Sequence, residues 1–498
     1  REMAIRAALG AGRRRLLRQT LTESLVLSAC GVVPGLALAF VSTQAIARMT
    51  AVDLPLLRDV RLDMTTLVFT SVLAIVTGLI FGLAPAIRMR DAALQAALKD
   101  GGRGVVDGRR GRWTRRSLVV SEIALACVLL FGAGLLTRSF VKVMGEDLGF
   151  SPDQIASVRV DPSSEWISSQ DKFTAYVDEL LRLSRQMPGT SAVGLTDRLP
   201  FTGNRSWSMM AKGRVYTRAT PPPESFVRMI SDGYVDAMGM RLVAGRDLSS
   251  QDRAKTEQVI LINESMARTL WPGESAIDKV MIADAERRVV GVVADVRHVV
   301  LEKTSGPEVF IPIRQSGDFS AVGLVMRTSM PPDAVGPAIR GALSPLVPNL
   351  PANQVETMRR LVDKTASPRR FVTILLGGFA AFALTLALLG IYGVISYTVG
   401  QRRQEIGVRL ALGASAARIQ RGVIRETLQL AAVGVAIGTV ASLLLARTLG
   451  SLLFGVTSTD AVTMLAMLLT VAAAAVAGAY LPARRASRID PATAFRST

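Results

Sequence analysis

The chain has 498 residues, of which 49% are hydrophobic, and its mean hydropathy of +0.34 is typical of a membrane protein. The formal net charge is +19, but aromatic residues make up only 5% and the basic excess lies in short segments beside apolar runs, which excludes the pattern of a nucleic-acid-binding protein. Cys30 and Cys127 both lie in apolar runs, so a disulfide framework is excluded and both are expected to be packing residues.

The chain opens with a basic segment that recurs near its other end. REMAIRAALGAGRRRLLRQTLTESL (1–25) aligns at a constant offset with QEIGVRLALGASAARIQRGVIRETL (404–428). The offset pairs Glu2 with Glu405, Arg6 with Arg409, Gly10 with Gly413 and Glu23 with Glu426. Each copy is expected to form a short helix that ends at the glycine, followed by a second helix that carries basic residues such as Arg418.

Two interpretations of the repeated segment remain open. A basic amphipathic helix beside an apolar run is typical of an anchor at the cytoplasmic membrane surface. Attraction to lipid alone does not require the recurrence of Glu-x-x-x-Arg-x-x-x-Gly, which favours a docking element for a cytoplasmic partner. The candidate residues for coupling to that partner are Glu2, Arg6, Gly10, Glu405, Arg409, Gly413 and Arg418.

Six apolar runs are long enough to cross a bilayer, which takes about 20 residues. They are predicted near 21–46, 65–87, 118–136, 371–399, 428–447 and 461–483. The basic segments around 13–18, 88–116, 402–425 and 484–488 fall on one side if all six runs span, and the positive-inside rule makes that side cytoplasmic. The segment 100–116, rich in Arg and Gly, is expected to be a flexible cytoplasmic linker.

Three pairs of glycines lie four residues apart inside these runs. They are expected to let helices approach closely, as small residues do in membranes. The pairs are Gly31 with Gly35, Gly78 with Gly82, and Gly434 with Gly438.

The segment 138–370 lies between the third and fourth runs and is expected to form an extracytoplasmic α+β domain. Strands are predicted at 155–160 and 289–293, and helices at 173–186, 263–271 and 334–346. The sequence has no G-x-x-x-x-G-K-[ST] nucleotide motif and no D-x-D-x-D-G calcium loop. His298 is the single histidine and is predicted to lie at the surface, so no enzymatic activity, cofactor or metal is expected.

Several stretches resemble one known family. TVGQRRQEIGVRLALGASAARIQRGVIRETL and LPARRASRIDPATAF are similar to the cytoplasmic segment and ending of FtsX-like permeases, the MacB class of ABC transporter subunits. Three further segments resemble recurring sequence motifs of the MacB-type periplasmic core domain: SDGYVDAMGMRLVAGRDL, VILINESMARTLWPGESAIDK and VVGVVADVRH. The resemblance covers essentially the whole chain.

The resemblance implies a domain organisation. It gives 1–99 as the end of a first FtsX-like unit, 117–137 as a span, 138–370 as the MacB-like core and 371–498 as a second FtsX-like domain. That arrangement is similar to the C-terminal part of an acidobacterial duplicated orphan permease, so the chain is expected to be a fragment of a longer protein. The fold class expected is a multi-span α-helical membrane protein with an α+β periplasmic domain.

The function implied is mechanotransmission by a non-catalytic permease subunit in a bacterial inner membrane. A separate cytoplasmic ABC ATPase would drive movement of the periplasmic domain, for export or an envelope process. The expected partners are the lipid bilayer, that ATPase, a second permease unit in the same chain or a dimer, and periplasmic proteins, but no nucleic acid. The alternative is a membrane-anchored sensor or scaffold without transport. A secondary transporter is disfavoured, because no ionisable residue is expected at the membrane midplane.

Overall fold

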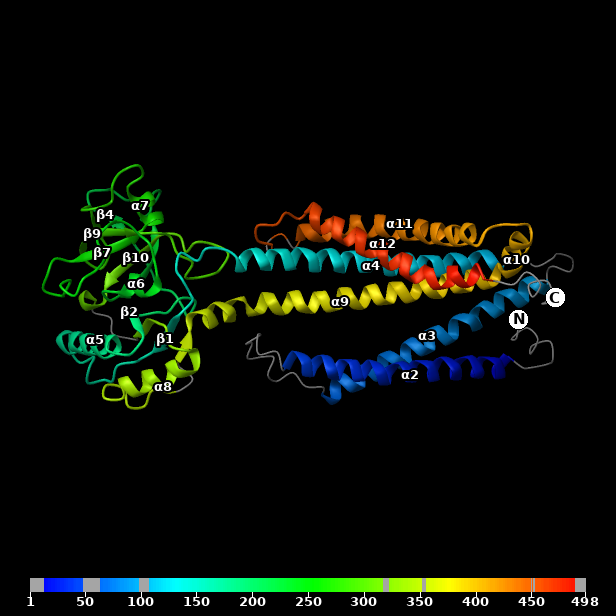
Figure 1. Cartoon of the computed structure of the whole chain (residues 1–498), viewed down its shortest axis with the longest axis horizontal. Coiled ribbons are helices and arrows are strands. Elements are labelled where there is room, and N and C mark those ends of the chain that lie inside the picture. The colour runs from blue at the N-terminus through cyan, green and yellow to red at the C-terminus, as the bar shows by residue number, and fades with distance from the viewer. Residues whose placement is uncertain are drawn as a thin grey trace. The chain divides into compact units, whose positions relative to one another are not determined.

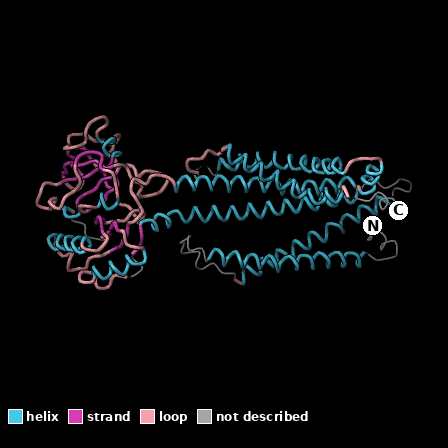
Figure 2. The backbone as a smooth tube through the Cα atoms, in the orientation of Figure 1, coloured by secondary structure: helices cyan, strands magenta, loops and turns pink. Residues whose placement is uncertain are grey.

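The computed structural model describes residues 13–47, 63–97, 107–316, 322–351, 355–448, 450 and 453–488 (Figure 1). The chain divides into two compact units. The first unit takes in Arg1–Val128, Ala380–Ala441 and Leu468–Thr498, and the second takes in Leu129–Phe379 and Ser442–Met467. All the strands of the described chain belong to the second unit, and the described residues of the first unit are almost entirely helical (Figure 2).

Long helices form wherever the sequence has an apolar run. These are α2 (Arg13–Ala47), α3 (Met64–Ala97), α4 (Asp107–Met144), α9 (Met358–Gln401), α11 (Ala416–Thr448) and α12 (Ala461–Ala486). Five of them, all except α3, are long and apolar enough to cross a membrane within the described residues. In α3 the apolar stretch found there is Met64–Ile80, so the span predicted at 65–87 stays a prediction.

The helices extend beyond the apolar runs that predicted them. α4 begins at Asp107, inside the segment expected to be a flexible linker, so that expectation is wrong for residues 107–116. Helix propagation costs little once a turn exists, and a stable span therefore carries its helix into polar sequence that would not form one alone. Residues 100–106, the remainder of the expected linker, lie outside the described chain.

The second unit contains one mixed sheet of twelve strands. Ten follow the order β12-β1-β11-β2-β5-β10-β7-β9-β8-β4, with β3 paired to β5 and β6 paired to β9. The bounds are β1 (Ile155–Arg159), β2 (Thr190–Thr196), β3 (Ser206–Ser208), β4 (Met210–Ala211), β5 (Glu224–Ile230), β6 (Leu242–Gly245), β7 (Val259–Asn263), β8 (Val280–Ile282), β9 (Glu286–Val293), β10 (Glu308–Pro312), β11 (Gly323–Thr328) and β12 (Val355–Thr357).

Two hydrophobic clusters form the core of this unit. One cluster includes the apolar faces of α5 (Gln170–Arg185), α7 (Glu264–Leu270) and α8 (Pro332–Leu343). The other includes α6 (Tyr234–Met238) and the residues where α4 ends and α9 begins. Alternate side chains of a strand point to opposite faces, so a sheet with apolar residues on both faces can support two such clusters. A short 3₁₀ turn, η2 (Ile313–Gln315), follows β10.

The elements predicted for this region are present, but they begin or end at different residues from those predicted. The strands expected at 155–160 and 289–293 are β1 and β9, and the helices expected at 173–186 and 334–346 are α5 and α8. Asn263 was expected inside a helix at 263–271, but it is the N-cap of α7 and accepts a hydrogen bond from Met266 N at 2.9 Å.

The prediction that His298 lies at the surface is wrong, because the residue is fully buried. Its Nδ1 lies 2.8 Å from Glu308 Oε1, and Arg228 Nε donates to the same oxygen at 2.7 Å. Burial, followed by the positive charge of Arg228, lowers the pKa of His298. Arg228 and Glu308 meet because β5 and β10 pair side by side, although 80 residues separate them, and His298 comes from the connection after β9.

Candidate functional site: the helix–turn–helix between α9 and α11

The second copy of the repeated segment folds as a short helix and a tight turn. α10 (Arg403–Ala411) follows α9 after Arg402, and Gly413 then has a φ of +89°, a conformation that favours glycine. Ala414 N donates to Arg409 O at 2.9 Å and Gly413 N donates to Leu410 O at 3.1 Å. This pair of bonds is a Schellman motif, which ends α10 and redirects the chain into α11.

The inner face of α10 rests on a small apolar cluster. Ile406 packs with Ile419 of α11 and Ala486 at the end of α12. Gln420 Nε2 also donates to Ser487 Oγ at 2.9 Å, which ties the start of α11 to the residue after α12. Val399 of α9 also packs against this cluster, so α9, α11 and α12 all contribute contacts beneath α10.

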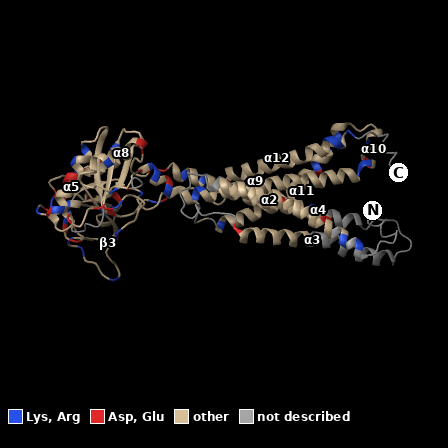
Figure 3. Cartoon of the chain, turned by 90° about the horizontal axis from the view of Figure 1, so that it is seen from below, with Lys and Arg blue, Asp and Glu red and all other residues tan. Residues whose placement is uncertain are grey.

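A partly open groove of about 560 Å³ lies between the end of α9, α10 and the start of α11. Its apolar walls include Ile395 and Val423, and its charged lining consists of Arg402, Glu405, Arg409, Arg418 and Glu426. Basic side chains gather near α10, whereas the apolar lengths of the helices carry few charges (Figure 3). Arg418 has no ion-pair partner among the described residues, whereas the other four charged residues of the groove form two ion pairs.

The outward face of α10 combines an ion pair with exposed apolar side chains. Arg409 donates to the carboxylate of Glu405 one turn earlier, and both side chains are more than half exposed. Val408 is 41% exposed and Leu412 is 82% exposed on the same face. An apolar centre with charges around it is the composition of a protein-binding surface. We call these four residues the α10 face.

The structure brings the predicted residues of the second copy together. Glu405, Arg409, Gly413 and Arg418 all line the groove. Glu2, Arg6 and Gly10 of the first copy lie outside the described residues. Sequence reasoning missed Val408 and Leu412. Their signal was that both fall opposite the buried Ile406 and the partly buried Leu410 on a helical projection, where a solvated helix would carry polar residues.

The predicted packing glycines differ in their surroundings. A Cβ on Gly434 would lie 2.8 Å from Ile123 Cβ, one on Gly438 would lie 2.6 Å from Cys127 Cβ, and one on Gly78 would lie 2.6 Å from Ser28 Oγ. Gly31 and Gly35 have open space within 4 Å among the described residues, and the surroundings of Gly82 are outside what the structure describes. Cys127 is buried, as expected of a packing residue, whereas Cys30 is exposed.

Two family models match the chain. The FtsX-like permease C-terminal model matches residues 1–94 and 377–491, and the MacB-like periplasmic core domain model matches residues 118–341. The first model thus covers both copies of the repeated segment.

Similar curated proteins are bacterial export systems and permeases. The macrolide export ATP-binding/permease protein MacB of Mannheimia succiniciproducens is 26% identical over 53% of this chain and 42% of its own length. The ABC transporter permease YknZ of Bacillus subtilis is 24% identical over 47% of this chain and 59% of its own length. The chain therefore aligns with well under two thirds of either relative.

Among solved structures, the periplasmic region of MacB from Actinobacillus actinomycetemcomitans is 14% identical over 44% of this chain and 95% of that chain, with a TM-score of 0.30. The extracellular domain of YknZ is 18% identical over 38% of this chain and 92% of that chain, with a TM-score of 0.27.

Proposed function

The chain belongs to the MacB/FtsX-like family of ABC transporter permeases, and we propose that it is a non-catalytic subunit that couples a separate cytoplasmic ATPase to its periplasmic domain. It is a multi-pass protein of the inner membrane with a large periplasmic domain. The ATPase binds the α10 face, and its ATP-driven movement is passed through the helices to the periplasmic domain, for export or an envelope process.

The α10 face is the observation that carries this proposal. Leu412 is an apolar side chain left 82% exposed at the end of a helix whose other face is buried. Leaving such a group in water is unfavourable by about 1.5–3 kcal/mol relative to full burial, so a partner that covers it gains free energy. The adjacent Glu405 and Arg409 give that partner a charge pattern to recognise.

The connections of the long helices support the transmission of movement. α4 is followed in the chain by β1, and α9 directly follows β12, so both lead to the sheet of the periplasmic domain. α9 extends over 44 residues to Gln401, and Pro368 in its first part leaves out one backbone hydrogen bond of the helix. A helix of this length is stiffer than a loop, and it therefore suits the transfer of a displacement better than a loop would.

We also propose that the two stretches matched by the FtsX-like model are parts of two permease units, 1–99 and 371–498, with the core domain at 138–370. The recurrence of Glu, Arg and Gly at a constant offset supports it. In this arrangement the first unit presents Glu2, Arg6 and Gly10 to a second ATPase subunit, or to the other half of an ATPase dimer.

The test is ATP turnover by the complex. The tagged full-length protein is purified from its native membranes, the co-purifying ATPase is reconstituted with it in proteoliposomes, and turnover is compared with that of the ATPase alone. We expect Glu405→Arg, Arg409→Glu and Gly413→Leu each to lower the stimulation at least tenfold. A contact between charges at a desolvated interface contributes roughly a few kcal/mol, and 1.4 kcal/mol is tenfold.

A matched control exists in the periplasmic domain. Arg182 and Glu179 form an exposed helical ion pair in α5, so Arg182→Glu makes the same change of charge and loses the same kind of pair. Stimulation should stay at the parental level in this variant. If the three α10 variants stimulate as well as the parent does, the segment is only a membrane anchor. If no ATPase co-purifies, the sensor or scaffold alternative is favoured.

A further inference from the structure

Glu426 joins three helical elements through one carboxylate. It lies in α11, and its Oε1 accepts a hydrogen bond from Arg116 Nη2 of α4. Its Oε2 accepts a hydrogen bond from Arg402 Nη1, between α9 and α10, at 3.0 Å. Each oxygen is therefore used by a guanidinium from a different part of the chain.

The helices around this carboxylate are also in close contact. α4 and α11 run parallel, since Arg116, Ile123 and Cys127 of α4 lie in turn against Glu426, Gly434 and Gly438 of α11. The glycines let the two backbones approach, so the ion pairs hold one end of a tightly packed helix pair. Next to Arg116 in α4, the Arg115 guanidinium lies 3.9 Å from the ring centroid of Tyr397 in α9.

The position of Glu426 relates it to the candidate site. Glu426 and Arg402 line the same groove as Glu405 and Arg409. A partner that displaces α10 therefore acts next to the carboxylate that holds α4 and α9. The same residue occurs in the first copy of the repeat, where Glu23 takes the place of Glu426 and Gly31 and Gly35 follow at the same spacing.

We propose that Glu426 is a positioning residue that fixes the cytoplasmic ends of α4 and α9 to α11, so that a displacement of α10 reaches both helices that lead to the periplasmic domain. The second half of this statement rests on the proposed function, whereas the first half does not. An isolated exposed ion pair contributes little. Here, however, the Glu426 carboxylate lies between the guanidiniums of Arg116 and Arg402. Removal of this carboxylate leaves two positive charges close together on different segments of the chain, where they repel each other.

The first measurement needs no ATPase. Spin labels are placed on Trp113→Cys in α4 or Gly400→Cys in α9, each paired with Arg421→Cys in α11, in full-length protein in lipid nanodiscs with Cys30→Ser and Cys127→Ala. Trp113 is 76% exposed and Gly400 has open space around it. Electron-spin distance measurements should give one narrow distribution for each pair. We expect Glu426→Gln at least to double the width of both.

Glu405→Gln is the matched control, because it removes a carboxylate from the same groove whose partner, Arg409, lies in the same helix. It should leave both distributions unchanged. The rescue variant combines Glu426→Arg with Arg116→Glu and Arg402→Glu, which reverses every charge and keeps the pairing. It should restore the parental distances. Widths in Glu426→Gln equal to those in Glu405→Gln overturn the proposal.

Folding failure is also informative. If Glu426→Gln does not accumulate in the membrane, the triple charge-reversal variant decides. Accumulation of that variant with parental distances supports the proposal, and failure of that variant to accumulate overturns it.

The second measurement uses the co-purified ATPase. Glu426→Gln should lower stimulation at least tenfold and change ATPase binding less than twofold. Absence of ATPase binding to the parent protein would refute the proposed function alone, because the distance measurements still decide the role of Glu426.

Discussion

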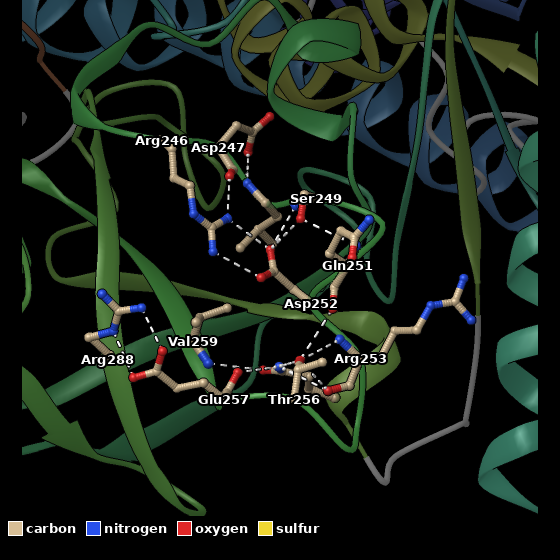
Figure 4. Close-up of polar contacts among 12 residues, drawn as sticks. Arg246, Asp247, Ser249, Gln251, Asp252, Arg253, Thr256, Glu257, Val259 and Arg288 are labelled. Atoms are coloured by element: carbon tan, nitrogen blue, oxygen red, sulfur yellow. Dashed lines mark hydrogen bonds and ion pairs between the residues drawn. The ribbon is translucent and has the colours of Figure 1, made fainter.

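Asp247 is a half-buried carboxyl in the turn after β6, and no cationic side chain is paired with it among the described residues. Leu248 N donates to its Oδ1 at 2.7 Å, whereas the guanidinium of Arg246 is directed to the carboxylate of Asp252 and to the backbone oxygen of Asp247 (Figure 4). Burial, with a smaller contribution from the negative charge of Asp236, raises the pKa of Asp247 to about 6. Its ionised form is therefore disfavoured in the folded protein.

This raised pKa predicts how the stability of the periplasmic domain depends on pH. A carboxyl whose folded pKa is raised contributes stability below its unfolded pKa of 3.8, and that contribution is lost as the pH rises through about 6. Asp247→Asn keeps the oxygen that Leu248 N requires and removes the charge. We expect it to raise the thermal midpoint at pH 7.5 by about 2–4 °C, the shift that follows from roughly 1 kcal/mol, and to raise it by less than half as much at pH 4.5.

Tryptophan fluorescence of the full-length protein measures this midpoint, because Trp166, Trp207 and Trp271 lie in the periplasmic domain. Asp252→Asn is the contrasting variant. Although burial opposes ionisation, Arg246 and the N–H of Ser249 hold the pKa of Asp252 below its usual value. Its replacement should lower the midpoint at pH 7.5. A midpoint for Asp247→Asn that is unchanged at both pH values would mean that water solvates this carboxyl fully.

Predictions from the sequence were least complete for single residues. The recurrence of Glu405, Arg409 and Gly413 was visible as a pattern, and these residues meet in one groove. The burial of His298 was not visible, because its partners Arg228 and Glu308 come from strands far apart in the sequence. No local pattern marks a buried polar residue whose partners are brought by tertiary structure.

At the scale of secondary-structure elements, the main contact is the one between α4 and α11. Gly434 and Gly438 leave no room for a side chain against Ile123 and Cys127. In a membrane, helices associate through close packing rather than through release of water, so small residues at the contact contribute strongly. Gly31 and Gly35, the glycines of the first copy of the repeat, have the same spacing but open surroundings within the described residues.

This difference predicts unequal effects of the same substitution. Gly434→Leu and Gly438→Leu each place a large side chain where a Cβ alone is already too close, and overpacking of this kind costs about 1–3 kcal/mol. We expect both variants to have a lower thermal midpoint in detergent and a lower yield. Gly31→Leu is the matched control, with the same change in an apolar helix, and should behave like the parent. Parental stability of both Gly434→Leu and Gly438→Leu would show that α11 does not pack on α4 through these residues.

Sequence periodicity located the elements but not their partners. The apolar runs predicted the helices because a span needs a continuous apolar length, and amphipathic spacing predicted α5 and α8. The strand order could not be predicted, because the parallel pairs β5 with β10 and β7 with β9 are formed by segments that the chain connects through long crossovers. The ends of the helices also differed, since capping and propagation depend on neighbouring structure.

At the scale of the whole molecule, charge and apolar length together specify a topology. Basic residues cluster around α10 and in the last turn of α12, and the predicted alternation places these segments on the cytoplasmic side. The helices α4 and α9 then emerge on the opposite side, where the periplasmic domain lies between them in the chain. Three spans precede Arg138 in this prediction, and an even number would reverse the side of every later segment, so the span predicted at 65–87 is decisive.

We expect cysteine labelling in intact cells to follow this alternation. In the background with Cys30→Ser and Cys127→Ala, Gln251→Cys in the periplasmic domain should react with a membrane-impermeant maleimide, and Arg421→Cys in α11 should react only after permeabilisation. Both parent residues are exposed, so accessibility to the reagent depends on the membrane and not on burial. Met187→Cys supplies the control for burial, because Met187 is 6% exposed and should stay unreactive until the domain unfolds. Labelling of Arg421→Cys in sealed cells would place α10 outside, where no ATPase could reach it, and coupling through the α10 face would then be impossible.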